Sequence, residues 1–108
     1  MATWYAGSFA MNRLAAGVLD RGSAFGGSAT PHGGNESTII SLYNPMAHLG
    51  LIIVPTGFAD AAMFKGAGTP YGASVVSGNP PAGPSPEELG VARYQGRRVA
   101  QTAKKLFA

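Results

Sequence analysis

The run from Leu49 to Pro55 is the feature that most constrains the fold of this chain. It places four consecutive apolar residues, LIIV, between a glycine and a proline. A short continuous apolar run of this kind is typical of a strand buried on both faces, as in a parallel sheet. Residues 22–25 (GSAF) form a weaker strand candidate. We therefore expect a parallel sheet that is covered on both faces.

Two helices are predicted around these strands. The first, from about Glu36 to Leu49, lies between the two strand candidates and carries apolar residues at helical spacing. The second, Pro86 to about Phe107, starts with Ser85 as its N-cap and has Glu88 three residues later, the pattern of a capping box. The order strand, helix, strand, helix predicts an α/β fold, namely a βαβα unit of a doubly wound parallel sheet.

The second helix is expected to bury one apolar stripe against the sheet. The stripe consists of Leu89, Ala92, Gly96, Val99, Ala100, Ala103 and Phe107. Five of the eight Lys and Arg residues also lie in this helix, and the residues before position 87 have no net charge. Acids at its start and lysines at its end match the helix dipole. We therefore interpret the basic cluster as a solvated helix face and expect no nucleic-acid partner.

Two strands are too few for a stable doubly wound sheet, because each would be an edge. We expect this chain to need partner strands, either from sequence that is missing here or from another copy, and hence to form a homo-oligomer. Residues 56–84 show no clear period. A loop of that length in a compact domain is usually functional or mobile.

Composition excludes several classes of site. The chain has no cysteine, so it has no disulfide or thiolate metal site, and this suits a reducing cytoplasm. Its two histidines have no clustered acid beside them, and we expect no metal site. The longest apolar run is far shorter than the roughly 20 residues that cross a bilayer, so no integral membrane insertion is expected. The N-terminus has no secretory signal pattern.

A glycine-rich turn, GGSATPHGGNE, occupies residues 26–36 directly before the first helix. In doubly wound sheets, ligands bind at the carboxyl ends of the strands, where this turn would lie. Glycines allow close approach of the backbone, and the first amides of a helix have no partners inside the helix. The alternative is a tight turn with no ligand, because a lone glycine-rich turn is weak evidence.

Four segments in the same order resemble one known family. FGGSATPHGGNEST, PMAHLGLIIVPTGF, GTPYGAS and PSPEELGVARYQG are similar to the C-terminal half of the WrbA-type NAD(P)H:quinone oxidoreductases, which are flavodoxin-like flavoproteins. The match covers residues 22–108, whereas residues 1–21 match poorly. The resemblance implies that residues 1–108 form a partial flavodoxin-like domain, with only the C-terminal βαβα half of its sheet present.

The family resemblance implies an FMN cofactor, NAD(P)H and a quinone as substrates, two-electron transfer through the flavin, and a homotetramer. It implies no catalytic side chain. The flavin-contacting residues that it implies are Ser28, Ala29, Thr30, Pro31, His32, Gly33 and His48. Trp4 resembles an aromatic residue that lines the substrate pocket beside the ring. By itself, His48 could equally be a histidine that caps the end of a helix.

Two functional hypotheses remain at this point. The loop that binds the FMN phosphate in a flavodoxin-like fold, and a second loop that covers the ring, have no counterpart in these residues. The chain is therefore either an FMN-dependent quinone oxidoreductase that works with complementary strands, or a truncated, non-enzymatic fragment. Such a fragment would keep the family's oligomerisation surfaces without productive FMN binding.

Overall fold

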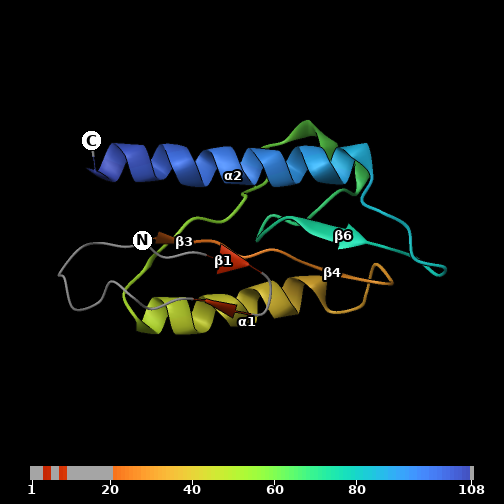
Figure 1. Ribbon diagram of the computed structural model, residues 1–108, viewed down its shortest axis with the longest axis horizontal. Helices are drawn as coiled ribbons and strands as arrows, with labels where there is room; N and C mark the ends of the chain where they lie inside the picture. The colour runs from red at the N-terminus through yellow and green to blue at the C-terminus, as the bar shows by residue number, and fades with distance from the viewer. Residues whose placement is uncertain (1–3, 6–7, 10–20, 108) are drawn as a thin grey trace.

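The structure is a computed structural model that describes residues 4–5, 8–9 and 21–107. In chain order, its elements are β1 (Trp4–Tyr5), β2 (Ser8–Phe9), β3 (Arg21–Gly22), β4 (Gly26–Ser28), α1 (Asn35–His48), β5 (Ile52–Ile53), the 3-10 helix η2 (Ala61–Lys65), β6 (Ser74–Val76) and α2 (Pro86–Phe107). The two long helices lie on opposite sides of the strands β3, β4 and β6 (Figure 1). Helix and strand thus mix as an α/β fold requires.

Four of the strands form parallel pairs around one segment of chain, residues 21–28. β3 pairs with β5, and β4 pairs with β6, both in parallel register. The parallel pairing predicted from the apolar run is confirmed, although β5 itself is only Ile52–Ile53. The candidate strand 22–25 is wrong in position, because residues 23–25 connect β3 to β4 rather than pairing. The doubly wound flavodoxin-like sheet stays a prediction.

β6 was not predicted, and it corrects the interpretation of residues 56–84 as one long loop. This stretch contains η2 and the three-residue strand β6, whose residue Val75 lies opposite Gly27 of β4. A strand this short, between glycines and prolines, is too brief to show a two-residue period. The pairing with β4, which is far away in sequence, defines it instead.

The helix α1 agrees with the sequence to within one residue at each end. Gly34 precedes it with φ of 87°, a left-handed conformation that favours glycine, and no side chain caps the helix start. Ile39 and Met46 are fully buried and pack with Ala24 of the central segment. This apolar cluster holds α1 against one side of the strands.

The helix α2 begins and ends where the sequence predicts. Its capping box is confirmed: Ser85 Oγ accepts a hydrogen bond from the Glu88 N–H at 3.1 Å, and Glu88 Oε1 accepts one from the Ser85 N–H at 2.8 Å. Val91 is fully buried and packs with Met63, Ala67 and Ala73. This second cluster holds α2 and η2 against the other side of the strands.

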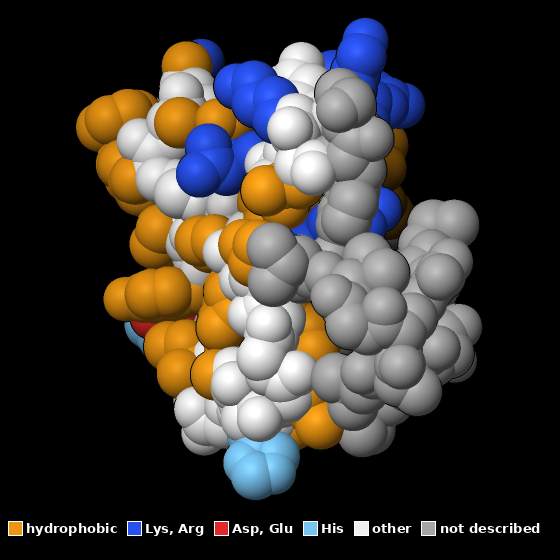
Figure 2. Space-filling view, turned by 90° about the vertical axis from the view of Figure 1, so that its left-hand side faces the viewer, with side chains coloured by type: hydrophobic (Ala, Val, Ile, Leu, Met, Phe, Trp, Pro, Cys, Tyr) orange, Lys and Arg blue, Asp and Glu red, His pale blue; other side chains and the backbone are white. Residues whose placement is uncertain are grey.

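The predicted buried stripe of α2 is wrong. Val91 and Gln95 are buried, whereas Leu89 is 38% exposed and Ala92, Gly96 and Ala100 are also exposed. A different face of α2 from the predicted one meets the strands. Gln95 on this face hydrogen-bonds to Ala24, between β3 and β4, and to Ala73, just before β6. Figure 2 shows hydrophobic side chains at the surface and Lys and Arg side chains gathered over the upper part of the molecule, where Figure 1 places α2.

Candidate functional site

The glycine-rich turn leaves β4 at Ser28 and is closed by its own hydrogen bonds. Ser28 Oγ donates to the carbonyl oxygen of Thr30 at 2.6 Å, and the Gly33 N–H donates to the same oxygen at 3.2 Å. The carbonyl oxygens of Ser28 and Ala29 accept hydrogen bonds from residues just after β6. The turn is therefore fixed to the end of the β4–β6 pair.

Gly33 is required by the turn itself. A Cβ atom at this position would lie 2.4 Å from Ser28 Oγ and 2.6 Å from Ser28 Cβ, which is closer than non-bonded atoms come. Gly33 therefore allows the two ends of the turn to touch. This is a structural reason for the glycine that needs no ligand.

Several amides on both sides of Gly33 stay unused. Among the described residues, the N–H groups of His32, Asn35 and Glu36 donate to no protein acceptor. Pro31 has no N–H, so it supplies no donor. The amides of Asn35 and Glu36 belong to the first turn of α1, where the helix dipole also favours negative charge. This end of the helix can receive an electron-rich group.

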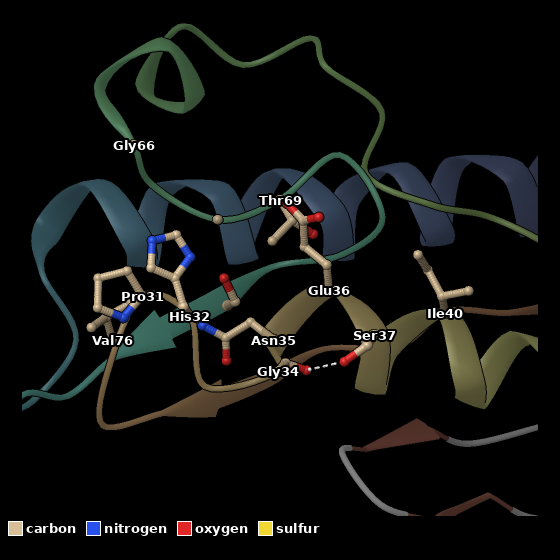
Figure 3. A pocket seen from close by; sticks show the side chains of 12 residues that line it. Pro31, His32, Gly34, Asn35, Glu36, Ser37, Ile40, Gly66, Thr69 and Val76 are labelled. Carbon is tan, nitrogen blue, oxygen red and sulfur yellow. Dashed lines mark hydrogen bonds between the residues drawn. The ribbon is translucent and has the colours of Figure 1, made fainter.

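A cavity of about 620 Å³ lies beside this helix start. Its lining residues are Pro31, His32, Gly34, Asn35, Glu36, Ser37, Ile40, Gly66, Gly68, Thr69, Ser74 and Val76. Figure 3 shows Pro31 and His32 before α1 and Glu36 in its first turn, with Gly66 and Thr69 on a separate segment of the chain. Among the residues that the structure describes, the lining contains no lysine or arginine, and Glu36 is its one carboxylate. The cavity therefore suits a neutral, polar and partly apolar ligand better than a phosphate group.

The expected cofactor residues divide into two groups. Pro31 and His32 line the cavity, while the other turn residues, 28–30 and 33, shape the turn beneath it. His48 does not join them, because it is the last residue of the fourteen-residue α1 and the cavity lies at the first turn. The length of such a helix separates the two ends by about 20 Å. Within one chain, His48 and the glycine-rich turn therefore cannot contact the same flavin ring.

Trp4 belongs to β1 and pairs with Phe9 of β2 in antiparallel register. Its side chain lies outside the described part of the chain, as does most of the segment 1–21. The expected role of Trp4 in lining a substrate pocket stays a prediction.

Asn35 is one of the cavity residues that the sequence did not predict. Its side chain is 7% exposed, and its Oδ1 has no hydrogen-bond partner. A buried polar atom without a partner is unfavourable, and such atoms are rare in native structures. The position directly after the glycines of the turn, in GGNE, is the only signal in the sequence that could have indicated it.

The opposite wall of the cavity includes Gly68 and Thr69 of the segment GTPYGA. Gly68 has φ of 70° and packs so tightly on α2 that a Cβ would lie 2.8 Å from Val91 Cγ1. Thr69 Oγ1 accepts hydrogen bonds from the amides of Tyr71 and Gly72, both at 3.2 Å. The Tyr43 hydroxyl donates to the Tyr71 carbonyl oxygen, and burial raises the pKa of this phenol. The wall is thus tied to both helices.

Two searches of the described residues bear on other kinds of site. Within residues 4–5, 8–9 and 21–107, no group of three or more His, Cys, Asp or Glu side chains could hold a metal ion. Neither described helix is long and apolar enough to cross a membrane.

Comparisons with known proteins identify relatives that carry one shared name. No family model matches the chain. It is similar to proteins named NAD(P)H dehydrogenase (quinone): one from Bradyrhizobium diazoefficiens is 42% identical over 90 residues, and one from Methanosarcina barkeri is 46% identical over 91 residues. These alignments cover 79% and 80% of this chain, but only 45% and 44% of the relatives.

A further relative with the same name, from Methanosarcina mazei, is 46% identical over 91 residues and is covered to 43% of its length. The chain therefore spans less than half the length of the curated relatives that it matches. The resemblance expected from the sequence is confirmed at this level: the chain is a relative of the C-terminal half of the NAD(P)H dehydrogenase (quinone) proteins.

Proposed function

We propose that this chain forms the ring-binding part of an FMN-dependent NAD(P)H:quinone oxidoreductase of the WrbA type. Its relatives named NAD(P)H dehydrogenase (quinone) support an oxidoreductase. The observation that carries the proposal is the set of unused amides at His32, Asn35 and Glu36 beside the cavity. Such donors stabilise charge that develops on a bound group during reaction, in the manner of an oxyanion hole.

The site fits the flavin ring but not the phosphate of FMN. The cavity has a buried unpaired acceptor in Asn35, free amides, and apolar surface from Ile40 and Val76. These features suit a flat, partly polar ring. A phosphate needs cations or several charge-assisted hydrogen bonds, and the described part of the lining contains no lysine or arginine. We propose that the phosphate contacts come from the half of the relatives that this chain does not span.

When bound, FMN would supply two-electron transfer from a reduced nicotinamide to a quinone, which is chemistry of the cofactor. The residues of this chain would position the ring. The turn closed by Ser28, Thr30 and Gly33 would hold Pro31 and His32 at the cavity edge, and the first turn of α1 would direct its amides towards the polar edge of the ring. No side chain of this chain is assigned a proton-transfer step.

Assembly is part of the proposal. If His48 contacts a flavin, the distance along α1 requires that this flavin belong to another copy. The homotetramer expected for the family would provide such a contact. Light scattering tests this point: an oligomer is expected, and a folded, monodisperse monomer would argue against a flavin contact for His48.

The second candidate is a non-enzymatic fragment that keeps the oligomerisation surfaces. Among the described residues, the lining of the cavity has no lysine or arginine, and this favours the fragment. Losing charged phosphate contacts costs about 1.5 to 3 kcal/mol for each hydrogen bond. A fragment of this kind would bind FMN weakly or not at all.

A flavin spectrum separates the two candidates. The purified protein is incubated with excess FMN and desalted, and its visible spectrum is recorded before and after NADH and then a quinone are added. A flavin band that bleaches with NADH and returns with quinone supports the oxidoreductase. A colourless protein overturns this proposal for the chain alone and supports the fragment.

A further inference from the structure

The carboxamide of Asn35 is placed to recognise one edge of a bound ring. Asn35 is the first residue of α1, lines the cavity and is more than nine-tenths buried. Figure 3 shows its side chain at the start of α1, pointing towards His32. Its Oδ1 has no hydrogen-bond partner. The Oδ1 atom is closed off from solvent, so it meets a donor in the cavity when the carboxamide turns towards it.

A carboxamide offers one acceptor and two N–H donors side by side in one plane. Rotation about the Cβ–Cγ bond exchanges the oxygen and the nitrogen, so either can face the cavity. This pattern is complementary to the edge of a pyrimidine-type ring that has a carbonyl beside a ring N–H. The flavin ring has such an imide edge, C=O, N–H, C=O.

We propose that Asn35 binds the imide edge of a flavin ring in this cavity, with Oδ1 accepting from the ring N–H and Nδ2 donating to a neighbouring ring carbonyl. The inference rests on the proposed function and adds to it a residue that determines which ring is accepted. Neighbouring Glu36 cannot replace it, because its carboxylate has no donor. The turn amides bind acceptors only, so Asn35 supplies the acceptor that the imide N–H needs.

The same geometry predicts opposite effects of one substitution on stability and on binding. Asn35→Leu keeps the branched shape of the side chain and removes the unpaired buried oxygen, so it should raise the melting temperature of the protein. It should also weaken ring binding. If Asn35 had only a structural role, its replacement would lower the melting temperature of the protein. The direction of the change in melting temperature therefore separates the two roles.

The experiment uses lumiflavin, the flavin ring without its ribityl phosphate chain, so that no phosphate contact is needed. Dissociation constants are measured by quenching of flavin fluorescence for lumiflavin and for 3-methyllumiflavin, in which the imide N–H is blocked. Wild-type protein should bind lumiflavin about tenfold more tightly than the methylated ring. Asn35→Leu should bind both rings equally and weakly. Asn35→Asp, which keeps an acceptor, should still prefer lumiflavin.

Asn44→Leu is the matched control, because Asn44 is an exposed asparagine of the same helix. It should bind and discriminate as the wild type does. If wild-type protein binds the two rings equally, or if Asn35→Leu keeps the preference, the role of Asn35 is overturned and the ring site stands. If wild-type protein binds neither ring, the proposed function and this inference are both overturned.

Discussion

The Oε1 atom of Gln95 accepts a hydrogen bond from the backbone N–H of Ala73 at 2.7 Å, joining α2 to the start of β6. The other end of the same side chain donates to the Ala24 carbonyl oxygen at 2.8 Å and to Ser23 Oγ. Gln95 is 5% exposed. One buried carboxamide therefore holds together three segments that are far apart in sequence.

Gln95 fills a gap between the two strand pairs. In the central segment 21–28, the Gly22 carbonyl oxygen accepts a hydrogen bond from the residue that follows β5. Further along, Gly26 and Ser28 hydrogen-bond to the residues on either side of β6. Ala24 lies midway between Gly22 and Gly26, so its carbonyl oxygen points to the same side as theirs. It accepts a hydrogen bond from the Gln95 side chain and not from a neighbouring strand. The side chain thus replaces one step of the ladder.

Replacement of Gln95 by leucine should strongly destabilise the fold. It would leave the Ala73 N–H and the Ala24 carbonyl buried without partners, at about 1 to 3 kcal/mol each, so we expect the free energy of unfolding to fall by about 3 kcal/mol. Urea unfolding measures this loss. Gln101→Leu, at an exposed position of the same helix, should change stability by less than about 0.5 kcal/mol. Equal effects of both variants would contradict the role of Gln95.

Gly72 should not tolerate even a methyl group. A Cβ there would lie 2.1 Å from the Ala24 carbonyl oxygen, a backbone atom in the buried centre of the fold that cannot move aside. We expect Gly72→Ala to lower the free energy of unfolding by about 3 kcal/mol, at the upper end of overpacking effects.

Gly90→Ala is the control for that experiment. Gly90 lies in α2, and a Cβ there meets no atom within 4 Å, so alanine should raise stability by about 1 kcal/mol through its higher helix propensity. Denaturant midpoints of the two variants should therefore move in opposite directions. A stable Gly72→Ala protein would show that residues 69–73 do not pack on Ala24 as the structure describes.

The sequence predicts the elements with local signals and misses those defined by distant contacts. Ser85 and Glu88 lie beside the helix that they cap, and α2 was placed correctly from them. The buried face predicted for α2 is wrong because the polar residue Gln95 is buried, where it hydrogen-bonds to backbone groups beside the strands. A pattern of apolar residues cannot indicate this.

The candidate site follows the same rule. The turn could be recognised from its glycines and from family resemblance, whereas the buried, unpaired oxygen of Asn35 depends on how α1 packs against the cavity. β6 likewise becomes visible only through its pairing with β4. Residues that act through distant neighbours cannot be assigned from local spacing.

Stability should fall in acid through Glu88. Burial disfavours its charged form, but hydrogen bonds from the N–H groups of Ser85 and Val76 and from the Ser85 hydroxyl outweigh it and hold the pKa of Glu88 below its usual value of 4.5. A lowered pKa in the folded state stabilises the protein above the unfolded pKa, and this stabilisation is lost as the pH falls through the folded pKa.

Urea unfolding at pH 7 and pH 3 tests this linkage. Glu88→Gln should be less stable than the wild type at pH 7, and the difference should shrink at pH 3, because the stabilisation by the carboxylate decreases as the pH falls below the unfolded value of 4.5. Glu87→Gln removes an exposed acid one residue away and should leave the pH dependence of unfolding nearly unchanged. A constant difference between wild type and Glu88→Gln at both pH values would contradict the linkage.

The contact between Gly33 and Ser28 predicts a rescue. Gly33→Ala places a Cβ 2.6 Å from Ser28 Cβ, so the turn must open, and we expect a loss of about 1 to 3 kcal/mol in the free energy of unfolding. Ser28→Gly removes the opposing Cβ and its hydroxyl. The loss of stability in the double variant should therefore be smaller than the sum of the two single losses. Coupled neighbours usually differ from additivity by about 0.5 to 3 kcal/mol, and we expect a difference in this range. Additive losses in urea unfolding would mean that the two ends of the turn do not touch, and that the turn beside the cavity is wider than the structure describes.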